Sequence, residues 1–289
     1  MRKVAIVTDS NSGILEEHIE GTDIYVLPMP FMISGETYFE GINLSKSEFY
    51  QYLAQGDDVV TSQPAVGDLM ELWDGLLQEY DEVVHIPMSS GLSGSCETAM
   101  MVAQDYDGRV EVVNNQRISV TQRQSVMDAL ELVRAGKNAA EVKEILEQNK
   151  YKSSIYIMVD TLKYLKKGGR ITAAAAAIGM VLNLKPVLQI QGEKLDAFAK
   201  ARGCKQGKRI MLDAMKKDFG TRFAEAARQG KMRLQMAHTN NEAAALEFRQ
   251  EVEAAFPGVE IYLDELPLSI ACHIGPGSLA IACTEDLSL

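Results

Sequence analysis

The first half of the chain alternates short apolar runs with stretches whose apolar residues recur at helical spacing. Strands are expected at residues 3–7, 24–31, 83–86, 110–113 and 154–159, and helices at 14–19, 66–80, 119–135 and 139–148 and in the segments that begin at residues 46 and 96. Pro28 and Pro30 predict that the second strand is irregular or lies at an edge. Strands alternating with helices are typical of a doubly wound, mainly parallel sheet whose loops gather at the carboxyl ends of the strands.

The pattern changes after Asp160. Residues 160–171 predict a short helix closed by two glycines, and an alanine run at 173–177 predicts close packing against another helix or the wall of a narrow apolar cleft. Strands are then expected at 184–190, 194–199, 233–238, 259–267 and 278–283, and helices at 204–219 and 241–255. We therefore predict an N-terminal α/β domain over residues 1–155 and a C-terminal α+β domain over residues 156–289.

The segment from Ser89 to Ser95 contains only serine, glycine and one leucine, between an apolar run and a predicted helix. Small residues there leave hydroxyls and backbone N–H groups open at a helix N-terminus, which favours an anion. No Lys or Arg lies between Val83 and Gly108, so a singly charged carboxylate is a better match than a phosphate. The alternative is an ordinary strand-to-helix connection whose serines cap the helix, and the same alternative applies to Thr61 and Ser62 before the helix at 66–80.

Composition narrows the classes of function. The 289 residues carry a net charge of -11 with a pI near 5.0, which argues against nucleic acid or an anionic membrane as the main partner. No stretch is long and apolar enough for an export signal or a membrane span. Four cysteines without a C-x-x-C pair suit a reducing compartment, so we expect a cytoplasmic protein.

Motifs for catalysis and metal binding match incompletely. Residues 91–95 resemble the nucleophile elbow G-x-S-x-G, but Ser95 stands where glycine is required. A serine hydrolase or acyltransferase assembled from Ser93, His273 and Asp9 remains the alternative function. The four histidines lack metal-ligand spacing, and Cys272 and His273 would point to opposite faces of a strand. Neither a metal nor a cofactor is expected.

Five stretches together resemble one family. They are Thr8-Asp9-Ser10, Thr61-Ser62-Gln63-Pro64, the loop of residues 89–95, Asp160-Thr161-Leu162 with Gly168-Gly169-Arg170-Ile171, and His273-x-Gly275-Pro276-Gly277. In this order and spacing the chain resembles the DegV family, the fatty-acid-binding subunits of the bacterial fatty acid kinase system.

The resemblance implies a two-domain, non-catalytic lipid-binding protein. It would hold one long-chain fatty acid in a tunnel between the domains and present the carboxylate to a separate ATP-dependent kinase, whose acyl-phosphate product feeds phospholipid synthesis. The residues implied to contact the carboxylate are Thr61, Ser62, Ser93, Gly94, Ser95, His273, Gly275 and Gly277, and those implied to face the kinase are Arg170 and Arg202. Gly203-Cys204 departs from the family pattern next to Arg202, and Ile274 stands where a threonine is common. A different long carboxylic acid is a third possibility for the ligand.

Elementary energetics agree with such a ligand. Burying about 14 methylenes at roughly 0.8 kcal/mol each offers on the order of 10 kcal/mol, which can offset the cost of ordering the chain and desolvating one hydrogen-bonded carboxylate. A carboxylate held by dipoles, and not by an arginine fork, also keeps its oxygen available as a nucleophile for phosphoryl transfer.

Overall fold

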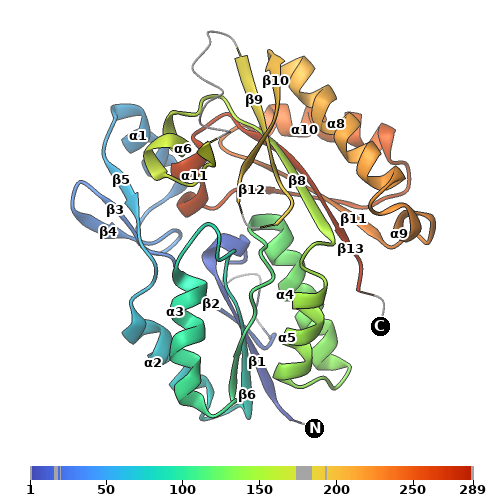
Figure 1. Cartoon of the computed structure of the whole chain (residues 1–289). Coiled ribbons are helices and arrows are strands. Elements are labelled where there is room, and N and C mark those ends of the chain that lie inside the picture. The colour runs from blue at the N-terminus through green and yellow to red at the C-terminus, as the bar shows by residue number, and fades with distance from the viewer. Residues whose placement is uncertain (1, 16–18, 20, 174–183, 193, 288–289) are drawn as a thin grey trace. The chain divides into compact units, whose positions relative to one another are not determined.

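A computed structural model describes residues 2–15, 19, 21–173, 184–192 and 194–287 (Figure 1). The chain divides into two compact units. Unit 1 comprises residues 1–150 and 267–269, and unit 2 comprises residues 151–266 and 270–289. The predicted boundary after residue 155 falls inside strand β8 (Ser153–Met158), and the whole of that strand belongs to unit 2.

Unit 1 is built on a four-stranded sheet in the order β2-β1-β6-β7, in which every neighbouring pair is parallel. The strands are β1 (Val4–Asp9), β2 (Ile24–Leu27), β6 (Glu82–Ile86) and β7 (Val110–Val112), and a small antiparallel sheet contains β3 (Phe31–Ile33), β4 (Glu36–Tyr38) and β5 (Val59–Thr61). This confirms the predicted parallel α/β architecture. The prediction that the strand with Pro28 and Pro30 is irregular or lies at an edge is also confirmed, since β2 is an edge strand that ends at Leu27 and the chain resumes as β3.

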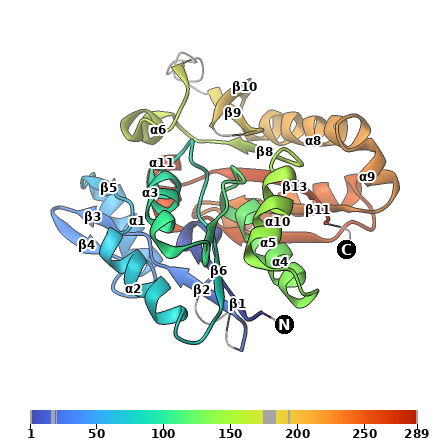
Figure 2. The ribbon, with the colours of Figure 1, turned by 60° about the horizontal axis from the view of Figure 1, so that its bottom comes forward.

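Helices cover both faces of the parallel sheet (Figure 2). The helices of unit 1 are η1 (Ser10–Ser12), α1 (Lys46–Gln55), α2 (Val66–Leu76), α3 (Ser95–Val102), η3 (Ala103–Tyr106), α4 (Ser119–Arg134) and α5 (Ala139–Gln148). The apolar stripe of α2, with Leu69 and the fully buried Trp73, packs with α3 against Val7 and Val83 of the sheet, while α4 and α5 cover the other face. Helix α1 begins with a capping box, in which Ser45 and Glu48 bond reciprocally.

Unit 2 contains a six-stranded sheet in the order β10-β9-β8-β13-β11-β12, antiparallel except for the last pair. Its other strands are β9 (Leu184–Ile190), β10 (Asp196–Arg202), β11 (Met232–His238), β12 (Ile261–Glu265) and β13 (Leu279–Glu285), and its helices are α6 (Lys163–Gly168), α8 (Cys204–Gly220), α9 (Ala224–Arg228), α10 (Glu242–Ala255) and α11 (Leu268–Ile274). Helices α8 and α10 bury Met211, Met215 and Phe248 against Met158 and Ile281 of the sheet. The α+β architecture predicted for the second half is confirmed.

Two local predictions need correction. A helix was predicted at 14–19, but the helical turn lies earlier, as the 3-10 turn at Ser10–Ser12. It ends at Gly13, which takes a left-handed conformation (φ 75°), and residues 14 and 15 are not helical, while residues 16–18 lie outside the described part. Cys272 and His273 are predicted to lie on a strand, but they lie on α11. The run Leu268-Ser269-Ile270 at the start of this helix alternates apolar and polar residues, as a short strand does. The alanine run at 173–177 lies outside the described residues from residue 174 onward.

Candidate functional site

The topology of unit 1 indicates where a ligand would bind. The chain leaves β1 toward β2 on one side and leaves β6 toward β7 on the other, so the loops after β1 and β6 diverge. Open parallel sheets bind ligands at such a switch point, beyond the carboxyl ends of the two strands. The loops at this point are the Asp9-Ser10-Asn11 turn and the serine-glycine loop of residues 89–95.

The serine-glycine loop leads from β6 to the first turn of α3, as predicted. Backbone bonds from Leu92 and Ser93 to the Ser89 carbonyl fold it into a tight turn, and the buried Ser89 donates its own N–H to the Arg117 carbonyl at 2.8 Å. The N-cap of α3 is Gly94, which has no side-chain cap bond. Ser93 Oγ accepts the N–H of Ser95 at 3.2 Å, which leaves the Ser93 hydroxyl proton available to donate.

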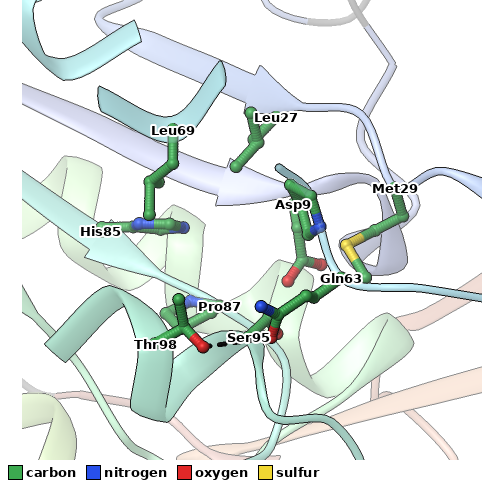
Figure 3. Close-up of a pocket in the computed structure, with 10 residues that line it drawn as sticks. Asp9, Leu27, Met29, Gln63, Leu69, His85, Pro87, Ser95 and Thr98 are labelled. Carbon is green, nitrogen blue, oxygen red and sulfur yellow. Dashed lines mark hydrogen bonds between the residues drawn. The ribbon is translucent and has the colours of Figure 1, made fainter. Parts of the chain in front are cut away.

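The segment Thr61-Ser62-Gln63-Pro64 lies against this loop. Gln63 Oε1 accepts a hydrogen bond from Thr98 Oγ1 of α3 at 3.1 Å (Figure 3), and a side chain at Gly94 would contact the same oxygen. The N-cap of α2 is Ala65, so neither Thr61 nor Ser62 caps that helix, and the capping explanation of these residues is wrong. The predicted carboxylate residues of unit 1 therefore come from the loop that leads into α3 and from a segment that is hydrogen-bonded to α3.

Asp9 holds the two strand ends together. The buried carboxylate accepts the N–H of Asn11 at 3.0 Å, the Asn11 amide at 2.9 Å, the N–H of Met88 at 2.8 Å and the Gln122 amide at 3.1 Å. Burial raises the pKa of Asp9, and these donors oppose the rise. Asp9 therefore ties the ends of β1 and β6 to helix α4.

The Asp9 network includes residues that the sequence analysis did not select. Asn11 also accepts a 2.6 Å bond from Ser269, and Gln122 is fully buried on α4. Asn11 lies in the polar loop that follows the first strand, which is a signal that the sequence does offer. Gln122 offers none, because one polar residue in an amphipathic helix is ordinarily exposed.

Two pockets open near the switch point in unit 1. A narrow one beneath the serine-glycine loop is lined by Asp9, Leu27, Met29, Gln63, Pro64, Leu69, His85, Pro87, Ser95 and Thr98 (Figure 3). A larger one of about 340 Å³ is lined by Ser10, Ile14, Leu15, Val26, Pro28, Glu40, Gly41 and Ile42. Its volume lies in the range of small-molecule sites, and most of its side chains are apolar.

In unit 2 the structure brings Arg170 and His273 together. Arg170 donates to the Gly168 carbonyl, and a methyl group on Gly168 would overlap the His273 ring at Nδ1. Burial, assisted by the Arg170 charge, lowers the pKa of His273 to about 4. His273 is therefore a neutral imidazole at physiological pH, able both to donate and to accept a hydrogen bond.

Two glycines and the hydrogen bonds of Thr239 shape the turn after His273. Gly275 has φ 80° and packs so closely on the Tyr164 ring that a side chain would overlap it, and Gly277 has φ 87°. Thr239 binds the turn on both sides, since its hydroxyl donates to the Gly275 carbonyl at 2.6 Å and its carbonyl accepts the Gly277 N–H at 2.7 Å. Thr239 therefore holds the turn in place, while the two glycines permit a backbone conformation that other residues rarely take.

Arg202 lies apart from Arg170 in unit 2. It is the exposed last residue of β10, and its N–H donates to Gln206 Oε1 at 2.6 Å. Ile171, next to Arg170, pairs with Leu195, which directly precedes β10, whereas Arg202 ends β10. The backbones of the two arginines are therefore separated by roughly 20 Å along the strand. A partner that contacts both arginines has to cover the length of β10.

A family model described as "Uncharacterised protein, DegV family" matches residues 3–286. The chain belongs to the DegV family. It is 32% identical to Protein DegV of Bacillus subtilis over 282 residues, covering 96% of this chain and 98% of that protein. The family assignment made from five short motifs is therefore confirmed.

Solved structures of the DegV family agree in fold. A DegV family protein from Thermus thermophilus, described by its fatty acid binding, has a TM-score of 0.88 at 32% identity and covers 99% of this chain and 100% of that one. DegV of Bacillus subtilis, described as a fatty acid binding protein, has a TM-score of 0.86 at 30% identity with the same coverage. Among the described residues of this DegV protein, no helix is long and apolar enough to cross a membrane, and no group of three acidic, histidine or cysteine side chains could hold a metal.

Proposed function

We propose that this DegV protein binds one long-chain fatty acid and holds its carboxylate at the serine-glycine loop and the Thr61-Ser62 segment. The observation that carries the proposal is the bonding of Ser93, whose hydroxyl accepts the N–H of Ser95 and keeps its own proton available to donate. Family members from Thermus thermophilus and Bacillus subtilis at similar identity bind fatty acids, which supports the same ligand class.

The site is suited to a carboxylate with no counter-cation. Arg117, whose carbonyl accepts the Ser89 N–H, uses its guanidinium within unit 1, where it donates to Ser125 Oγ and to the Asn149 carbonyl and faces Asp128. The donors left to the anion are hydroxyls and backbone N–H groups. They stabilise the charge through dipoles and leave the carboxylate oxygen nucleophilic.

We extend the proposal to His273, Gly275 and Gly277, which the family resemblance assigns to the same ligand. A neutral imidazole can donate a hydrogen bond to a carboxylate without forming an ion pair. The Thr239 hydrogen bonds hold the turn beside it, in a conformation that the two positive-φ glycines permit. The larger pocket next to Ser10 offers apolar side chains that could cover part of an acyl chain.

We further propose that the protein presents the carboxylate to a separate ATP-dependent kinase, without catalysing the reaction itself, in the cytoplasm and in support of phospholipid synthesis. The charge distribution supports a docking surface on unit 2. Of the 40 acidic residues 25 lie in unit 1, and of the 29 basic residues 19 lie in unit 2. Residues 163–217, which include Arg170 and Arg202, hold 13 basic and three acidic residues, and such a segment attracts an acidic or phosphate-bearing partner.

Mass spectrometry of the purified protein tests the proposal. We expect one long-chain fatty acid per chain in the organic extract, and a matching mass increment in the native protein. A delipidated sample should regain that increment when fatty acid is added. Protein that is empty and takes up no added fatty acid would overturn the proposal, and labelling of Ser93 by a fluorophosphonate would then favour the hydrolase alternative.

A further inference from the structure

The narrow pocket beneath the serine-glycine loop contains polar groups that the proposed function does not use. His85 lies on β6 with 2% of its surface exposed, and Ser95 is the first residue of α3 with 8% exposed. Both line the pocket, with Asp9 and Gln63 on its other sides (Figure 3).

Within the described part of the chain, neither ring nitrogen of His85 has a hydrogen-bond partner, and neither does the Ser95 hydroxyl. Nearly all buried polar side chains in folded proteins have a partner, either protein or ordered water. A histidine that faces only apolar groups would lose the hydrogen bonds it makes to water in the unfolded chain. The pocket therefore has to supply a ligand to these groups.

The chemistry of the lining selects the ligand. Burial lowers the pKa of His85 to about 3, so the ring is neutral and offers one donor and one acceptor. The Asp9 carboxylate in the same wall disfavours an anion, and its oxygens already accept bonds from Asn11, Met88 and Gln122. The free space is about 10 Å³, which is the room that one water molecule needs.

We propose that one ordered water molecule occupies this pocket and bridges His85 and Ser95, which makes His85 a positioning residue for the carboxylate-binding loop. The water accepts from or donates to His85 and donates to Ser95 Oγ. Ser95 in turn donates its N–H to Ser93 Oγ, so the water fixes the first turn of α3 behind the residue that faces the ligand. The positioning role rests on the proposed function, whereas the water site does not.

A high-resolution crystal structure of the wild-type protein tests the water site directly. We expect a density peak within hydrogen-bond distance of a His85 nitrogen and of Ser95 Oγ. The two ring nitrogens should also give the separate ¹⁵N shifts of a neutral tautomer with a bonded N–H at pH 7. A dry pocket, or a side chain filling it, would overturn the proposal.

Fatty acid affinity in a double-mutant cycle tests the positioning role. His85→Phe removes the hydrogen bonds at similar volume, Ser95→Ala removes the other end of the bridge, and His85→Gln is the conservative variant. We expect the Kd to rise about 3- to 10-fold in His85→Phe and in Ser95→Ala. In the double variant the rise should be smaller than the product of the two single effects, and His85→Gln should recover part of the affinity.

The outcomes separate the possible failures. An unchanged Kd in His85→Phe alongside a lowered Tm would show a merely structural role and overturn the positioning proposal, as would a double variant whose effect equals the product. If His85→Phe does not fold, Ser95→Ala decides, because the water should be lost or displaced in its crystal structure. If the wild type takes up no fatty acid, the proposed function and the positioning role both fail, while the density still decides the water site.

Discussion

Asp9 Oδ2 accepts the backbone N–H of Met88 at 2.8 Å and so joins the ends of β1 and β6, 79 residues apart in the chain. Asp9 Oδ1 meanwhile accepts from Asn11 and Gln122. A single carboxylate therefore fixes both loops at the switch point of the parallel sheet. The shape of the site therefore depends on an acceptor that need not touch the ligand.

Replacing this carboxylate by an amide should be costly. In Asp9→Asn one acceptor oxygen becomes an NH₂ group facing donors, so we expect the free energy of unfolding to fall by roughly 2 to 4 kcal/mol. Urea unfolding measures the change. Asp105→Asn, at an exposed position of η3, is the matched control and should stay within about 0.5 kcal/mol of wild type. Equal stability of the two variants would contradict the assigned role of Asp9.

Much of this organisation is predictable from the sequence, because it follows local rules. The capping box at Ser45, the strand-loop-helix around Ser93 and the alternation of strands with helices depend on neighbouring residues. The Gln122 to Asp9 bond joins residues 113 apart, and no local pattern marks it. Charge shows a related limit, since the net charge of -11 averages over a basic segment, and the structure adds that this segment belongs to one unit.

A positive-φ glycine can be needed for its backbone conformation or for the space that its missing side chain leaves, and two glycines of unit 2 separate these roles. Gly275 (φ 80°) packs against Tyr164, whereas Gly258 (φ 81°) has no neighbour within 4 Å of where a side chain would start. Gly258→Ala should cost only the backbone conformation, about 1 to 2 kcal/mol. Gly275→Ala should cost about 1 to 3 kcal/mol more, because it also overpacks the Tyr164 ring. Chemical denaturation of both variants measures the difference, and equal losses would show that Tyr164 moves away freely.

Ser93→Ala tests the carboxylate contact in the proposed function. The variant removes a hydroxyl donor and leaves one carboxylate oxygen short of a partner, so we expect a loss of roughly 1 to 3 kcal/mol of binding free energy, or about 5- to 150-fold in Kd. Isothermal titration of delipidated protein with fatty acid measures it. Ser90→Ala, in the same loop, is the control and should bind like wild type. If both variants retain fatty acid equally well, Ser93 does not bind the carboxylate.

Arg170→Ala tests whether the Arg170 charge lowers the pKa of His273. The Arg170 charge contributes to the lowered pKa of His273, although burial contributes more. Removing the guanidinium should therefore raise the pKa of His273 above its value of about 4 while leaving it below the ordinary 6.5. A titration of the His273 ring by NMR measures the shift, with Lys166→Ala on the exposed side of α6 as the control.

The same variant makes a prediction about stability against pH. A histidine with a lowered pKa binds fewer protons in the folded than in the unfolded protein, so the wild type loses stability as pH falls from 6.5 toward 4. In Arg170→Ala that acid-side loss of stability should be smaller, because the folded and unfolded pKa values of His273 lie closer together.

We also expect Arg170→Ala to leave fatty acid retention unchanged and to lower kinase-dependent phosphorylation, since Arg170 is assigned to the partner surface. Weakened retention with normal phosphorylation would instead place Arg170 at the ligand.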